Sequence, residues 1–169
     1  VWVDETRPWN QGARLTSWEL QQENIANTLI CDNCGGHLMQ HGMVDLVIVG
    51  TDRTTHTGDV ANKIGTLGRA ILAAHYKIPF YVAAPVSTFD FRCKTGNDIT
   101  IEHRHQDEVL MQEGADENGN ILRIRIASPG SNAYNPAFDI TPAKLISGII
   151  TEKGIVKAHH RAIIALSKI

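Results

Sequence analysis

Short apolar runs alternate with longer amphipathic segments along most of the chain. Strands are predicted over residues 1–4, 27–31, 45–49, 79–84 and 149–151. The run at 46–49 is an unbroken Leu-Val-Ile-Val, which is typical of a central strand buried on both faces. Because segments with helical periodicity separate the strands, this order predicts a parallel sheet wrapped by helices. The expected fold class is α/β, with a Rossmann-like, mostly parallel sheet and helices on both faces.

Residues that commonly cap or begin helices indicate where helices start between these strands. Helices are predicted at about 17–23, 37–41, 60–76 and 142–148, and again from 159. Thr16 and Glu19 have the spacing of a capping box before the first helix. Asp59 can cap the long helix from 60 to 76, in which apolar side chains recur at helical spacing. Thr141 and Pro142 indicate another helix start, with proline at the first helical position.

The periodicity weakens between residues 87 and 136. Residues 99–103 and 121–127 are candidates for short strands. Residues 113–120 are rich in Gly, Asp and Asn and predict an exposed turn. We therefore expect an irregular excursion in this part of the chain.

Size and charge narrow the class of protein. The 169 residues fit one globular domain, and the 43% of hydrophobic residues is typical of an α/β protein with its own core. The 16 basic and 18 acidic residues form no basic stripe, so we expect no nucleic-acid partner. No apolar stretch approaches the roughly 20 residues that cross a bilayer, and no signal pattern is visible. We expect a cytoplasmic protein without a membrane partner.

Cysteine usage and the first residues add two further expectations. Cys31 and Cys34 form a CxxC pair, but no second pair at ligand spacing accompanies it, so a zinc or redox site is the weaker alternative to reduced thiols. We predict no metal site. The chain starts inside a strand-like segment without an initiator Met, so we expect it to be part of a larger protein.

Polar residues follow most of the predicted strands. They are Asp4 to Arg7, Asp32 with Asn33, Gly50 to Arg53, and Ser87 with Thr88. In open α/β sheets, ligands bind beyond the carboxyl ends of the strands, because the loops there converge. Carboxylates, an arginine, amides and hydroxyls at one rim predict a site for a small polar ligand.

The loop from Gly50 to Lys63 carries the most chemistry. We expect it to lead into the start of a helix whose first turn contains Asn62 and Lys63, which would combine backbone donors, the helix dipole and a cation. Neither the Walker order nor the dinucleotide-binding order of glycines is present. The loop therefore favours a phosphorylated metabolite over ATP or NAD.

Asp52, at the end of the apolar run, is the candidate acid or base. Burial at a strand end would favour proton transfer by a carboxyl group. A structural alternative exists for each candidate. Asp52 can cap neighbouring amides, Lys63 can be a solvated helix residue, and Arg7 can pair with Asp4 or Glu5.

Four ordered blocks give the chain a resemblance to a known family. They are Glu5-Thr6-Arg7-Pro8 with Gln11 to Thr16, Gly58 to Thr66, Pro79 to Pro85, and Asn135 to Pro142. In this order they resemble the methylthioribose-1-phosphate isomerases and span nearly the whole chain. The resemblance implies the Rossmann-like carboxyl-terminal domain of a larger isomerase over residues 1–169, with an amino-terminal helical domain outside this chain.

The resemblance also implies roles for individual residues. Asp52 matches the catalytic aspartate of the family, its presumed proton donor, and Gln11, Asn62 and Lys63 match substrate-binding positions. Arg7, in the first block, is a further substrate-binding candidate. The second catalytic residue of the family is a cysteine in an upstream loop, next to a substrate-binding arginine. Neither is in this chain, so we expect it to require the upstream amino-terminal half of the same protein.

The implied reaction is an aldose-ketose isomerisation in methionine salvage. It converts 5-methylthioribose 1-phosphate to 5-methylthioribulose 1-phosphate without a metal or organic cofactor, and the resemblance further implies a homodimer. Isomerases of ribose 1,5-bisphosphate or 5-deoxyribose 1-phosphate are alternatives, although the loop after residue 84 offers only Ser87 and Thr88 for a second phosphate. A non-enzymatic regulatory subunit of the translation-initiation guanine-nucleotide exchange factor is the alternative from another class.

Overall fold

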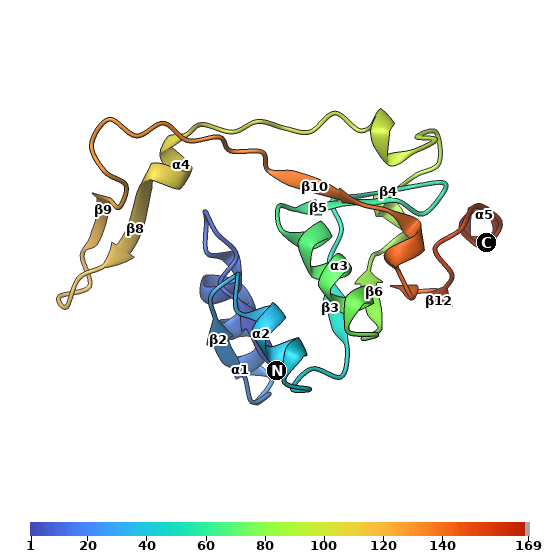
Figure 1. The fold of residues 1–169 in the computed structure, drawn as a ribbon, viewed down its shortest axis with the longest axis horizontal. Helices are drawn as coiled ribbons and strands as arrows, with labels where there is room; N and C mark the ends of the chain where they lie inside the picture. The colour runs from blue at the N-terminus through green and yellow to red at the C-terminus, as the bar shows by residue number, and fades with distance from the viewer. Residues whose placement is uncertain (168–169) are drawn as a thin grey trace. The chain divides into compact units, whose positions relative to one another are not determined.

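The computed structural model describes residues 1–167 and separates the chain into two compact units. The first unit contains Val1–Cys34 and His103–Pro136, and the second contains Gly35–Glu102 and the chain from Ala137 onward. Figure 1 follows the order of the elements from the amino to the carboxyl terminus. Each unit is described below by itself.

The first unit begins with a strand, a helical segment and a parallel strand, as predicted. Strand β1 (Trp2–Asp4) pairs in parallel with β2 (Thr28–Ile30), and the π-helical turn η1 (Gly12–Thr16) and helix α1 (Ser17–Gln22) connect them. The predicted capping box at Thr16 is wrong, because Thr16 has helical dihedral angles and makes no side-chain cap. The chain is already helical in η1, so no helix start is needed at that residue.

The irregular excursion contains a β-hairpin in the first unit. Helix α4 (Asp107–Leu110) leads into β8 (Met111–Ala115), which pairs antiparallel with β9 (Ile121–Arg125). The predicted turn at 113–120 is therefore too long. Asp116 closes a shorter turn, since its carboxylate accepts the amides of Asn118 and Asn120 at 2.9 and 2.8 Å. The strand expected at 99–103 is not formed, and His103 makes only an isolated bridge with Pro136.

One sheet of the second unit is mostly parallel, as predicted. Its order is β12 (Gly154–Val156), β11 (Gly148–Thr151), β6 (Phe80–Ala83) and β3 (Val47–Val49), and only the pair β11–β12 is antiparallel. The prediction that residues 45–49 form the centre of the sheet is wrong, because β3 lies at an edge of this sheet and Ile48 is 56% exposed. The centre is β6 and β11, where Val82 and Ile149 are fully buried.

A second four-stranded sheet in this unit replaces the start of the predicted long helix. Its order is β10 (Phe138–Thr141), β5 (Val60–Lys63), β4 (Arg53–Thr55) and β7 (Phe89–Asp90). Helix α3 (Thr66–His75) begins six residues later than expected, because residues 60–63 pair with β10 and β4. Asp59 does not cap the predicted helix; its carboxylate accepts the amides of Gly96 and Ala143, each at 2.9 Å, and both residues begin short 3-10 turns.

The remaining short elements differ little from the prediction, with one exception. Helices α2 (Gly35–Gln40) and α5 (His160–Leu166) match the segments expected near 37–41 and after 159. The helix predicted at 142–148 is wrong, since Thr141 ends β10 and only the 3-10 turn η4 (Ala143–Leu145) follows before β11. Two more 3-10 turns, η2 (Val86–Thr88) and η3 (Gly96–Asp98), flank β7. No helix within residues 1–167 is both long enough and apolar enough to cross a membrane.

The core of the second unit anchors the sheets that carry several of the predicted site residues. Helix α3 contacts β6 and β10, and buries Ala70 and Ala73. Phe80 and Ile163 are almost completely buried in the same cluster. Each such large side chain stabilises the fold by about 1.5–3 kcal/mol relative to an exposed one. The sheet edges that carry the polar residues are therefore fixed to a packed interior.

Candidate active site

Three of the predicted site residues lie on one hairpin of the second unit. Asp52 directly precedes β4, and its backbone amide donates to the Ala61 carbonyl of β5 at 2.9 Å. Asn62 follows Ala61, and its Oδ1 atom lies 3.9 Å from the place that a Cβ atom on Gly50 would take. The loop 50–52 and Asn62 are therefore neighbours, and Lys63 is the last residue of the same strand.

Asp52 lines an open pocket of about 390 Å³ in the second unit. The pocket is formed by residues after β3 and β6, as expected for loops at the carboxyl ends of strands. Its lining consists of Asp52, Arg53, Ser87, Thr88, Phe89, Asp90, Phe91 and Arg92. Within residues 1–167 the Asp52 carboxylate makes no hydrogen bond or ion pair, so it does not act as a structural cap. The burial expected at this strand end is wrong, because Asp52 is exposed.

Two arginines of this pocket were missed as site residues by the sequence argument. Arg53 pairs with Asp90 at 3.7 Å, and Arg92 follows on the same loop. The other Asp90 oxygen accepts the amides of Arg92 and Cys93 at 3.0 and 3.1 Å, which shapes the loop. The premise that this loop offers only Ser87 and Thr88 to a second anion is therefore wrong.

Cys93 lies next to this loop as a neutral thiol. Burial, followed by the negative charges of Asp90 and Asp98, raises the pKa of the Cys93 thiol. Its Sγ atom donates to the Thr95 carbonyl at 3.3 Å. A buried, protonated thiol is a poor nucleophile, so Cys93 does not replace a catalytic cysteine. All three cysteines are free, and no group of three potential metal ligands occurs within residues 1–167.

Asn62 and Lys63 belong to a strand and not to the first turn of a helix, which corrects the prediction. The Asn62 Nδ2 atom donates to the Thr66 hydroxyl at 3.0 Å, and that hydroxyl donates to the Lys63 carbonyl at 2.6 Å. Lys63 Nζ lies 5.4 Å from the centre of the Phe138 ring. Both side chains are half-buried beside the turn that leads into α3.

The start of α3 is already occupied by a carboxylate. Asp139, on β10, accepts the amides of Gly65 and Leu67 at 2.7 and 2.9 Å. The expectation of free helix-start amides for a phosphate around residues 60–63 is wrong, because α3 begins at Thr66 and Asp139 already binds two amides there. Burial raises the pKa of Asp139, and the two amide bonds oppose this rise by stabilising the ionised form. Beside this turn, the side chains of Asn62 and Lys63 therefore remain the candidate anion-binding groups.

The other two predicted site residues, Arg7 and Gln11, belong to the first unit. The loop after β1 is anchored by Asp32, whose carboxylate accepts the amides of Thr6 and Arg7, both at 2.7 Å. Thr6 has a φ of 64°, which is unfavourable for a β-branched residue and is typical of constrained functional loops. Gln11 is exposed at the start of η1. This loop therefore presents Gln11 to solvent from a rigid support.

The Arg7 side chain is bound within the first unit. Its guanidinium donates to the Val109 carbonyl at 2.8 Å, to Gln112 at 2.9 Å and to the Pro8 carbonyl at 3.1 Å. The alternative of a pair with Asp4 or Glu5 is therefore not observed. These bonds join the loop after β1 to α4 and β8, so Arg7 supports the loop that carries Gln11.

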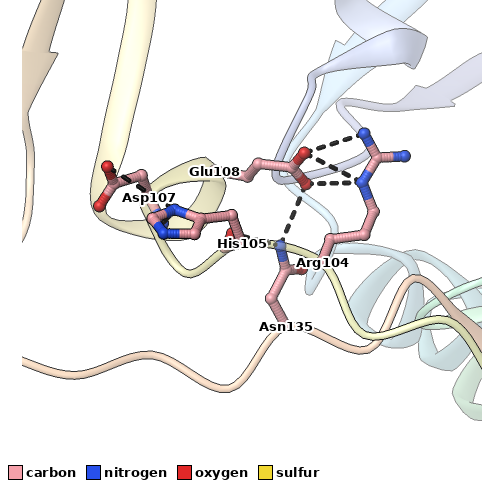
Figure 2. A network of polar contacts seen from close by, with 5 residues as sticks. All are labelled: Arg104, His105, Asp107, Glu108 and Asn135. Atoms are coloured by element: carbon pink, nitrogen blue, oxygen red, sulfur yellow. Dashed lines mark hydrogen bonds and ion pairs between the residues drawn. The ribbon is translucent and has the colours of Figure 1, made fainter.

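A polar network in the first unit was also missed by the sequence argument. Figure 2 shows Arg104 and Asn135 bonded to the Glu108 carboxylate. In the ion pair, Arg104 Nη2 lies 2.8 Å from Glu108 Oε1. Burial alone would raise the pKa of Glu108, but hydrogen bonds from Arg104, Asn135 and Trp9 outweigh it and lower that pKa. Asn135 is the first residue of the last family-like sequence block, and this position was the signal in the sequence that could have indicated the network.

Known proteins resemble this chain in both sequence and structure. Two relatives are named methylthioribose-1-phosphate isomerase and are each 58% identical to this chain. The protein from Desulfosudis oleivorans matches over 98% of this chain and 45% of its own length. The protein from Gluconobacter oxydans matches over 91% of this chain and 42% of its own length. The crystal structure of 5-methylthioribose 1-phosphate isomerase from Pyrococcus horikoshii has a TM-score of 0.89 and 46% identity, covering 99% of this chain and 44% of that one.

A solved structure with another name is also similar. The translation initiation factor eIF-2B subunit delta from A. fulgidus has a TM-score of 0.80 and 45% identity, over 93% of this chain and 43% of that one. The chain thus spans less than half the length of these relatives. The sequence pattern of the initiation factor 2 subunit family matches residues 1–158, and the chain belongs to that family.

Proposed function

We propose that this chain forms the carboxyl-terminal part of an isomerase that converts 5-methylthioribose 1-phosphate to 5-methylthioribulose 1-phosphate in methionine salvage. The observation that carries the proposal is the hairpin on which an exposed carboxylate, Asp52, occurs together with Asn62 and Lys63. Relatives at 54–58% identity have the name of this enzyme. A carboxylate without a structural partner, on the same hairpin as an amide and a cation, suits proton transfer on an anionic sugar.

The proposed reaction assigns a separate role to each of these groups. The phosphate on C1 blocks ordinary ring opening, so the enzyme must hold a dianion while a hydrogen moves between adjacent carbons. Lys63 and Asn62 bind the phosphate, since a cation and an amide donor stabilise its charge. Asp52 transfers a proton at a sugar oxygen. Gln11 binds the sugar, and Arg7 stabilises the loop that carries Gln11.

The proposed enzyme includes more than this chain. Its catalytic cysteine and a further substrate-binding arginine belong to an upstream half of the same protein, and residues 1–169 act as its carboxyl-terminal domain. The length of the relatives supports this division, because the chain covers about 45% of them. We include in the proposal a cytoplasmic homodimer that uses no metal or organic cofactor.

One assay tests the assignment. The intact protein is incubated with 5-methylthioribose 1-phosphate, and ketose formation is followed for wild type, Asp52→Asn and the control Asp45→Asn. Asp45 is exposed in the same unit, so its substitution removes the same charge elsewhere. Asp52→Asn is expected to lower kcat by about 100-fold or more, as for loss of an acid or base. Wild-type turnover by Asp52→Asn would reject this role.

The same assay distinguishes the alternative substrates and the non-enzymatic class. Ribose 1,5-bisphosphate and 5-deoxyribose 1-phosphate are tested in parallel. Arg53 and Arg92 line the pocket beside Asp52 and supply cations for the second phosphate of the bisphosphate, which 5-deoxyribose 1-phosphate lacks. We expect methylthioribose 1-phosphate to have the highest kcat/KM. Absence of turnover with all three sugars would favour the regulatory-subunit class, to which the A. fulgidus structure belongs by name.

A further inference from the structure

Strand β10 lies directly beside the two phosphate-binding candidates. In the antiparallel ladder with β5, Phe138 pairs with Lys63, and Asp139 pairs with Asn62. The Phe138 ring also lies under the Lys63 ammonium, with 5.4 Å between Nζ and the ring centre, a distance at which a cation is attracted to an aromatic face. The positions of both candidate residues therefore depend on β10.

The turn after Lys63 is held from the same strand. Gly65 has a φ of 102°, which glycine adopts readily because it has no Cβ atom. The same absence of a side chain means that Gly65 itself does not restrain the turn. The Asp139 carboxylate bridges this turn by accepting the amides of Gly65 and Leu67 at 2.7 and 2.9 Å. Hydrogen bonds to an ionised acceptor are stronger than neutral ones, so this bridge is a strong restraint on the turn.

A short relay connects the bridged turn to Asn62 and Lys63. Thr66 lies between the two bridged amides, and its hydroxyl accepts from Asn62 Nδ2 at 3.0 Å and donates to the Lys63 carbonyl at 2.6 Å. Displacement of the turn would move Thr66 and thereby rotate the Asn62 amide. The bridge also occupies the two amides that an incoming phosphate would otherwise use, so it directs the phosphate to the side chains.

We propose that Asp139 is a positioning residue for phosphate binding: by bridging the turn between β5 and α3, it sets the orientation of Asn62 and Lys63 through Thr66. Asp139 touches no substrate in this role. The inference rests on the proposed function, since it assumes that Asn62 and Lys63 hold the substrate phosphate.

The experiment uses the intact protein and two variants of the bridge. Asp139→Asn keeps the shape and one acceptor, and Asp139→Ala removes both acceptors. Asp98→Asn is the control, because Asp98 is an exposed aspartate of the same unit that accepts from the amide and hydroxyl of Thr95. Steady-state kinetics with methylthioribose 1-phosphate and competitive inhibition by inorganic phosphate are measured at a temperature where circular dichroism shows each variant to be folded.

A positioning role predicts a specific pattern. Asp139→Asn should raise KM and the phosphate inhibition constant together by about tenfold, the effect of weakening one charged hydrogen bond, with a smaller change in kcat. Asp139→Ala should raise both constants further than Asp139→Asn does. Asp98→Asn should have the KM and the phosphate inhibition constant of the wild-type protein. If Asp139→Ala does not fold, the test rests on Asp139→Asn, which keeps a good helix-capping residue.

Four results would overturn the inference, and they differ in what else they reject. Wild-type KM and phosphate inhibition in folded Asp139→Asn, with normal turnover, would reject the positioning role alone. The same holds for a loss confined to kcat, or for an equal loss in Asp98→Asn. Absence of turnover in the wild-type protein would reject the proposed function together with this inference.

Discussion

At the scale of single residues, close backbone approaches decide which substitutions the fold accepts. Gly12, at the start of η1, lies so near the Asp4 carbonyl oxygen that a Cβ atom would overlap it. Gly68, in the first turns of α3, has no atom within 4 Å of the same position. The two glycines therefore have opposite roles, although the sequence alone does not distinguish them.

These two glycines give a matched pair of stability predictions. Gly12→Ala should lower the free energy of unfolding by about 3 kcal/mol or more, because β1 and η1 must separate to admit the methyl group. Gly68→Ala should raise it by about 0.5–1 kcal/mol, because alanine loses less backbone entropy than glycine in a helix. Urea unfolding of both variants measures the difference. An equal effect of the two substitutions would contradict the close approach at Gly12.

At the scale of elements, side-chain carboxylates join segments that are distant in sequence. Glu108, on α4, accepts from Arg104 in the preceding loop and from Asn135, 27 residues later. These bonds attach the hairpin β8–β9 at its base, together with Arg7, whose guanidinium reaches Val109 and Gln112. A two-stranded hairpin is marginally stable by itself, so these attachments stabilise it.

The lowered pKa of Glu108 predicts a pH dependence of stability. The ionised form is favoured in the folded state, so its contribution to stability is present above the ordinary glutamate pKa of 4.5 and is lost as the pH falls through the lower pKa of the folded state. Glu108→Gln should reduce the free energy of unfolding by about 1–3 kcal/mol at neutral pH and flatten this acid-dependent loss. Denaturant unfolding between neutral and acidic pH measures both effects.

The neighbouring carboxylate provides the control. Asp107 is more exposed than Glu108 and pairs only loosely, at 3.7 Å, with Arg123 and His105. Asp107→Asn should therefore change stability by less than about 0.5 kcal/mol, as for other exposed pairs. A pH profile of Glu108→Gln that is parallel to wild type would show that another group causes the acid-dependent loss.

At the scale of the whole molecule, the site residues are divided between two compact units. Asp52, Asn62 and Lys63 belong to one unit, and Arg7 and Gln11 belong to the other. The chain also covers only about 45% of its relatives. The proposed reaction requires groups from the upstream half in addition to those of this chain.

This division predicts that the chain alone does not complete the reaction. Residues 1–169, produced by themselves, should form no detectable ketose from 5-methylthioribose 1-phosphate, because the proposed catalytic cysteine is upstream. The intact protein under the same conditions is the positive control, and a coupled ketose assay is the measurement. Turnover by residues 1–169 at the rate of the intact protein would show that the catalytic set is complete without the upstream half.

Local sequence patterns determined a large part of this protein. Periodicity and apolar runs predicted the strands near residues 2–4, 28–30, 47–49, 80–83 and 148–151, because burial of an apolar face is encoded by neighbouring residues. The same reading selected Asp52, and the structure places it in an open pocket with Ser87 and Thr88. The segment from Arg53 to Lys63 was assigned to a loop and helix, although β-branched residues around Thr57-Gly58-Asp59 were a hairpin signal.

Only the tertiary structure decided how the polar groups of distant segments are matched. Asp139 binds the Gly65 amide at the start of α3, although the two residues are 74 positions apart. Asp59 binds the amide of Ala143, 84 residues later, instead of capping the predicted helix at residue 60. Such bonds depend on the register between β5 and β10, which no local periodicity encodes. The sequence determined which residues are candidates for chemistry, because side-chain type is local, whereas long-range pairing determined which backbone amides the carboxylates bind.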